Sequence, residues 1–138
     1  PVSCAALPER TGAEVLLVSG AGEYAAWGHL VVGLPALLPV LDPTVMGWQG
    51  RSFYLGPHKE RVFDTRGNAG TTAWVDGRIV GCWVQDPDGA VRIHAVEPVP
   101  RSAQRLLDAE AERLTAWLDG FTVGSVYRSP AMTTARSS

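Results

Sequence analysis

The sequence predicts an α+β fold, a small antiparallel β-barrel or strongly curled sheet with one C-terminal amphipathic helix. Short β-prone segments recur from residue 13 to residue 96, with turn-forming residues between them. A helical pattern with a period of 3.6 residues follows at 102–119. The length of 138 residues suits a single domain, and the apolar fraction of 46% is typical of a globular protein.

The first part of the chain is expected to supply three strands and a capped turn. AEVLLVS (13–19) and YAAWGHLVV (24–32) are β-prone, and a third such run covers 36–41. Pro39 lies inside the third run and favours an edge strand, because proline cannot donate a ladder hydrogen bond. Asp42 and Pro43 then predict a short helical turn, with Asp42 as its N-cap and Pro43 as its first residue.

The clearest local signal is a hairpin over TTAWVDGRIVGCWVQ (71–85). Asp76-Gly77 is the preferred two-residue turn, because both central positions require positive φ. The turn fixes a register that pairs Val75 with Arg78, Trp74 with Ile79 and Ala73 with Val80. This register places Trp74, Ile79 and Trp83 on one face, and Ala73, Val75, Val80, Cys82 and Val84 on the other. Both faces are apolar, so the hairpin is expected to be covered on both sides.

A second turn and a helix complete the predicted pattern. DPDG (86–89) favours a type I turn, and in the strand that follows Arg92 and His94 are expected to face water. Ser102 is predicted to cap a helix that ends near Asp119, with Gly120 as its stop. The apolar stripe of this helix comprises Ala103, Leu107, Ala111, Leu114 and Leu118, joined by Leu106 and Trp117. A last strand is expected at 121–129 and a frayed tail at 130–138.

Charge and residue spacing argue against several classes of function. The formal net charge of −2 provides no bulk attraction to nucleic acid. His29, His58 and His94 lack metal-ligand spacing, and the sequence has no nucleophile elbow or phosphate-binding glycine loop. Cys4 and Cys82 are expected to be reduced thiols, which fits a cytoplasmic location. We therefore predict no cofactor, no metal and no membrane partner.

One segment, QGRSFYLGPHKERVFDTRGN (49–68), combines basic with aromatic residues. Basic side chains neutralise phosphates, and flat aromatic faces contact sugars or unstacked bases. The segment therefore supplies the candidate DNA-binding residues Arg51, His58, Lys59, Arg61 and Arg66.

Three stretches carry a resemblance to a known family: LLPVLDPTVMGWQGR (37–51), FYLG (53–56) and NAGTTAWVDGRIVGCW (68–83). In this order they resemble the C-terminal portion of the winged-helix DNA-binding-domain family, which includes bacterial AlkZ- and YcaQ-type DNA glycosylases. The resemblance extends from about Thr11 to Arg128. It implies a larger repair protein that binds double-stranded DNA and removes alkylated bases by hydrolysing the N-glycosidic bond. The family's Gln-x-Gln or Gln-x-Asp catalytic motif has no match here, so no catalytic residue is carried over.

The resemblance also implies a domain organisation. Residues 1–10 are expected to be an irregular linker from a missing N-terminal domain made of winged-helix units, and 11–129 a β-barrel-like C-terminal domain. This domain is expected to be non-catalytic and to support DNA binding. The alternative is an effector-sensing or protein-interaction barrel of a winged-helix regulator without base-excision activity. Four apolar side chains could fill the core of this domain or contact the winged-helix half, and both interpretations remain open for Trp48, Trp74, Ile79 and Trp83.

Overall fold

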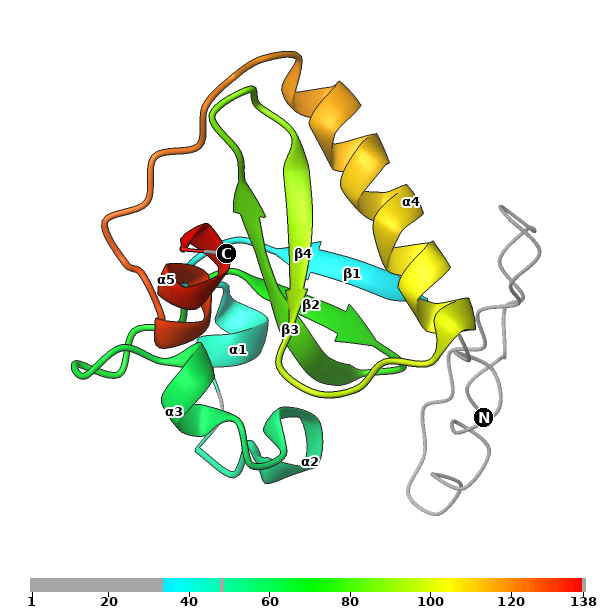
Figure 1. The fold of residues 1–138 in the computed structure, drawn as a ribbon. Coiled ribbons are helices and arrows are strands. Elements are labelled where there is room, and N and C mark those ends of the chain that lie inside the picture. Colours follow the sequence, from blue (N-terminus) through cyan, green and yellow to red (C-terminus); the bar gives the residue numbers. More distant parts are fainter. Residues whose placement is uncertain (1–33, 48, 138) are drawn as a thin grey trace, which may run out of the picture. The chain divides into compact units, whose positions relative to one another are not determined.

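The computed structural model describes residues 34–47 and 49–137, which form an antiparallel sheet with helices packed against it (Figure 1). The strands are β1 (Pro35–Leu38), β2 (Thr72–Val75), β3 (Arg78–Gln85) and β4 (Val91–Ala95). The helices are α1 (Pro43–Met46), α2 (Ser52–Leu55), α3 (Lys59–Val62), α4 (Arg101–Leu118) and α5 (Pro130–Arg136). The strands predicted at 13–19 and 24–32, the linker at 1–10 and Trp48 lie outside the described residues.

Among the described residues, the sheet has four strands in the order β1-β2-β3-β4 and is not closed, with β1 and β4 at its edges. The α+β class is confirmed, but the prediction of a β-barrel was wrong. Closure would require the outer strands β1 and β4 to pair with each other, and within the described residues β1 pairs only with β2 and β4 only with β3. The edges of the described sheet therefore remain separate.

The turn after β1 has the predicted structure. β1 is an edge strand that ends just before Pro39. The Asp42 carboxylate accepts a hydrogen bond of 2.8 Å from the Thr44 backbone N–H, and Pro43 opens α1. The edge strand, its capped turn and the single helical turn that follows are confirmed, but the strand ends at Leu38 and not at Leu41, because residues 40–41 form a turn.

The central hairpin has the predicted turn, but its register departs from the prediction two residues later. Asp76 and Gly77 both have positive φ, and Trp74 pairs with Ile79 as expected. Ala73, however, pairs with Gly81 instead of Val80, because a β-bulge adds one residue to β3. A Cβ at Gly81 would overlap the backbone oxygen of His94, so the strands approach closely beside the bulge.

The bulge exchanges the faces of all later β3 side chains, because the alternation along a strand has a period of two. Trp83 packs with Ala111 and Leu118 of α4, not with Trp74 and Ile79 as predicted. Cys82 and Val84 pack instead against α5. The prediction that both faces are covered is confirmed, with α4 on one face and the shorter helices on the other (Figure 1).

The long helix differs from its prediction at its start and on its outer surface. α4 begins at Arg101 after Pro100, so Ser102 lies inside the helix and is not its cap. The helix ends as predicted, with Asp119 and Gly120 in the left-handed region. Leu106 and Trp117 were wrongly assigned to the buried stripe, since they are 41% and 74% exposed.

The C-terminal part corrects two further predictions. Residues 121–129 form no strand. The side-chain amide of Gln85 donates to Phe121 O and accepts from Val123 N, both at 2.9 Å, so these two backbone groups bond a side chain instead of a neighbouring strand. The expected tail is instead α5, which Ser129 caps and whose residues Ala131, Met132 and Ala135 are buried.

The two polar residues of β4 behave differently from each other. Arg92 is exposed as predicted, and its guanidinium pairs with the Asp86 carboxylate at 2.9 Å. His94 is half-buried, and its buried Nε2 has no hydrogen-bond partner. The prediction that His94 faces water was therefore wrong, because His94 pairs with Cys82, which packs against α5.

Candidate nucleic-acid interface

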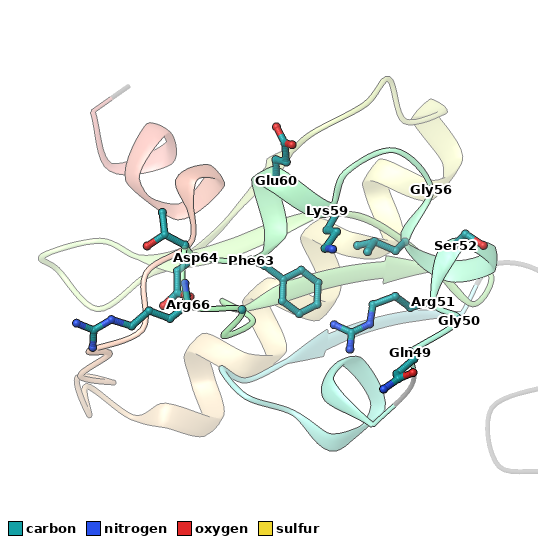
Figure 2. A pocket seen from close by; sticks show the side chains of 13 residues that line it. Gln49, Gly50, Arg51, Ser52, Gly56, Lys59, Glu60, Phe63, Asp64 and Arg66 are labelled. Atoms are coloured by element: carbon teal, nitrogen blue, oxygen red, sulfur yellow. The ribbon is translucent and has the colours of Figure 1, made fainter.

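The basic and aromatic segment folds into α2, α3 and a tight turn that together surround an open pocket of about 800 Å³ (Figure 2). The charged residues that line it are Arg51, Lys59 and Arg66, with Glu60 and Asp64. Three cations against two carboxylates leave an excess of one positive charge, although the whole chain carries a formal charge of −2. The pocket is therefore a local basic site on an acidic chain.

Arg51 is held in place before any ligand binds. Its guanidinium lies 4.8 Å from the centre of the Phe63 ring, and its Nη2 donates to the Met46 carbonyl at 3.4 Å. A guanidinium over an aromatic face is stabilised by the ring quadrupole. Figure 2 shows Arg51 and Phe63 facing each other in the pocket. This placement reduces the side-chain entropy that anion binding would cost.

Arg66 stands on a turn that is closed at its base by a bridge between Phe63 and Ala69. The Asp64 carboxylate accepts hydrogen bonds from the backbone N–H groups of Arg66 and Asn68, at 2.9 and 2.8 Å, and from the Asn68 side chain at 2.9 Å. These hydrogen bonds lower the pKa of Asp64 below its usual value, and the bond from the Asn68 side chain has the largest effect. Asp64 thus orders the turn that presents Arg66, which is the physical reason for a carboxylate in a basic pocket.

The five candidate DNA-binding residues separate into two groups. Arg51, Lys59 and Arg66 line the pocket. His58 instead lies 2.7 Å from Glu97 Oε2, and Arg61 Nη1 donates to the Val96 carbonyl at 3.1 Å. His58 and Arg61 thus tie the start of α3 to the segment after β4.

The sequence reasoning missed the uncharged polar residues of the pocket. Gln49, Ser52 and Thr65 line it beside the cations and offer amide or hydroxyl groups. The only feature of the sequence that marks these three residues is their position close to basic residues. An analysis based on charged residues does not detect them.

Three residues of the candidate apolar set, Trp74, Ile79 and Trp83, lie inside the described fold, whereas Trp48 lies outside the described residues. Trp74, Ile79 and Trp83 are each less than one-tenth exposed. Trp74 stacks on Tyr54 with ring centroids 5.3 Å apart, and its Nε1 donates to Thr72 Oγ1 at 2.8 Å. Trp83 Nε1 donates to the Leu38 carbonyl at 2.9 Å. These contacts satisfy both indole groups within the described residues.

Other kinds of site find little support in the described residues. Burial raises the pKa of the Cys82 thiol to about 12, so a nucleophilic thiolate is disfavoured at neutral pH. Within the described ranges, no group of three His, Cys, Asp or Glu side chains is arranged to hold a metal ion. No helix in these ranges has the length and apolar character needed to cross a membrane.

The class of protein that this geometry defines is an α+β domain with a basic, aromatic-walled surface pocket. The sequence model of the DNA glycosylase AlkZ-like family matches residues 6–117, which is most of the chain. The chain therefore belongs to the AlkZ-like DNA glycosylase family. Neither a curated protein nor a solved structure gives a significant match.

Proposed function

We propose that this chain is a DNA-contacting, non-catalytic domain of a winged-helix DNA glycosylase-like repair protein that acts on alkylated bases in double-stranded DNA. The observation that carries the proposal is the presence of Arg51, Lys59 and Arg66 among the residues that line one pocket. Family membership supports DNA as the polyanion. The three cations would bind backbone phosphates, which position a duplex without reading its sequence.

The three cations of the pocket differ in how firmly they are held, and each could bind a phosphate in its own way. Arg51 presents a planar fork fixed on Phe63, and Arg66 stands on the turn that Asp64 orders. Lys59 is exposed at the first residue of α3 and adds a flexible point charge. Successive phosphates along a strand can therefore be met by separate side chains.

The proposal assigns no bond-breaking step to these residues. Gln49 is the glutamine that lines the pocket, and it does not belong to a Gln-x-Gln or Gln-x-Asp motif. Hydrolysis of the N-glycosidic bond is proposed to belong to the winged-helix units of the intact protein. This domain would hold the duplex against them.

The test is a salt titration of DNA binding with the 138-residue chain and a fluorescein-labelled 20-base-pair duplex. We expect the triple variant Arg51→Gln, Lys59→Gln, Arg66→Gln to bind more weakly. Removal of one phosphate-neutralising side chain lowers the slope of log K against log salt by about 0.9, so the slope should fall by roughly 2 to 3.

The matched control neutralises Arg101, Arg105 and Arg113, three exposed arginines of α4. It makes the same change in net charge on the helix that covers the opposite face of the sheet. We expect its slope to stay near that of the parent chain. An equal loss in both triple variants would show a general charge effect and contradict the proposed site.

The alternative function is that of a winged-helix regulator. Such a regulator would make the same DNA contacts but would not excise a base. Incubation of the intact protein with an alkylated duplex separates the two, because a glycosylase releases the modified base and a regulator does not. Unchanged duplex after incubation at saturating protein would favour the regulator.

A further inference from the structure

The outer edge of β4 presents backbone groups that no described residue pairs with. Asp86 N donates to Ala90 O, and Val96 N donates to Val80 O, so bonded pairs stand at both ends of the β3–β4 ladder. Alternation along an antiparallel ladder then directs the N–H and C=O of Ile93 and Ala95 away from β3. An unpaired edge of this kind is a template for another strand.

The end of β4 nearest the turn shows the same orientation directly. Val91 N points outward and donates to Thr115 Oγ1 of α4 at 2.8 Å. Because Thr115 satisfies this group, the part of the edge that no described residue pairs with begins after Val91. Any added strand would therefore lie along Ile93 and Ala95.

An apolar groove of about 460 Å³ lies between this edge and α4, which run beside each other (Figure 1). Its walls include Val91 and Ile93 from β4, and Ala111 and Ala116 from α4. The small alanines leave room between helix and strand for side chains of an added strand.

The charges at the groove are unbalanced. Asp108 and Glu112 lie on its α4 side, four residues apart and both exposed. Arg92 also lines the groove, but its guanidinium is bound to Asp86 and donates to the Ala135 carbonyl at 3.3 Å. The α4 rim is therefore acidic, and the edge lacks a free lysine or arginine side chain of the kind that protects exposed strands.

We infer that this groove is a docking site for an extended peptide segment of a partner protein, which adds to β4 as a fifth strand. Backbone pairing with Ile93 and Ala95 would supply the affinity, as in other cases of strand addition. A small apolar side chain would enter between Ile93 and Ala116, and a lysine or arginine would lie against Asp108 and Glu112. This site is distinct from the basic pocket and does not depend on the DNA-binding proposal.

The test uses a labelled lysine-valine-threonine-valine-lysine peptide and fluorescence anisotropy with the full 138-residue chain. Ala116→Phe fills the groove from an exposed helix position, and we expect about tenfold weaker binding, a typical effect of blocking a central contact. Ala109→Phe, at an exposed α4 alanine that does not line the groove, is the matched control and should bind as the parent does.

Two further arms test the chemistry of recognition. A peptide N-methylated at the central residues keeps its side chains but cannot pair with β4, and its binding should be abolished. Glu112→Lys should weaken the lysine peptide about threefold and favour a glutamate-flanked peptide, because exposed charge pairs have modest strength.

The outcomes that overturn the inference are distinct. Absence of binding by the lysine peptide, or equal binding of its methylated form, excludes strand addition to β4. Light scattering that shows a dimer of the parent chain, converted to monomer by Ala116→Phe, would assign the groove to a second copy of this chain instead of a peptide.

Discussion

The two faces of the sheet are covered in different ways. One face carries α4, a single helix of 18 residues whose buried side chains repeat along one stripe. The other carries α1, α2 and α3, each four residues long, together with α5. Helices of one turn are not stable by themselves, so their conformation depends on tertiary contacts. The α4 face is thus specified by local sequence, and the pocket face by contacts between distant residues.

The pocket face shows what such contacts are. Tyr54 of α2 donates from its hydroxyl to the Val45 carbonyl of α1 at 3.0 Å and stacks on Trp74 of β2. Val45, Tyr54, Val62 and Ile79 belong to one apolar cluster. This cluster joins α1, α2 and α3, and two of these helices, α2 and α3, form the pocket, so the candidate site depends on the core beneath it.

The largest effect should come from the α4 face. Leu107 is fully buried and packs with Ala73 and Val80, so Leu107→Ala should lower the free energy of unfolding by about 3 kcal/mol through reduced burial and a cavity. Urea denaturation measures the decrease. Leu106→Ala is the control, because Leu106 is 41% exposed and should change stability by about 0.5 kcal/mol. Equal decreases at the two leucines would mean that α4 does not pack as described.

The sequence could predict the elements that local signals specify, whichever face of the sheet they lie on. Period and turn chemistry identified α4, the Asp76-Gly77 hairpin and the Asp42 cap, because each depends on neighbouring residues. They did not identify α2 and α3, since four-residue helices have no periodicity to detect. α5 was missed although Ser129-Pro130 is a helix-start signal, because the following residues are small and polar.

The candidate site was predicted in part for the same reason. Composition marked the segment that holds Arg51, Lys59 and Arg66. It could not show that His58 and Arg61 bind Glu97 and the Val96 carbonyl, because these partners lie 39 and 35 residues away. Charge can thus be counted from a sequence, but the direction of a charged side chain comes from packing.

The second prediction concerns the bulge, which decides which face each β3 side chain joins. A Cβ at Gly81 would overlap His94 O and lie 3.0 Å from Ala95 Cα, both backbone atoms. Gly81→Ala should therefore cost about 2 kcal/mol of unfolding free energy, since β4 must move. Gly124→Ala is the control, because no atom lies within 4 Å of its added Cβ. Full tolerance of Gly81→Ala in thermal denaturation would contradict the close approach of the strands at the bulge.

The smallest effect should come from the turn of the pocket face, and it depends on pH. The pKa of Asp64 is lowered chiefly by the Asn68 side chain, so the carboxylate form stabilises the folded turn. This contribution is complete above the ordinary carboxyl pKa of 3.8 and is lost as pH falls through the lower pKa of the folded state. Asp64→Asn should therefore lower Tm slightly at pH 7, and its difference from the parent should shrink below pH 3.8.

A double-mutant cycle with Asn68→Ala isolates the interaction that shifts this pKa. In the Asn68→Ala background, the strongest partner of the Asp64 carboxylate is absent, so Asp64→Asn should change Tm less than it does in the parent chain. The same variants, used in the DNA titration, show whether Arg66 contributes to binding through its ordered position on the turn or through its charge alone. If the turn positions Arg66 for phosphate, Asn68→Ala weakens duplex binding without changing the net charge of the chain. Unchanged binding would mean that Arg66 acts only as a mobile charge. The hydrogen bonds that order its turn would then not be needed for DNA binding.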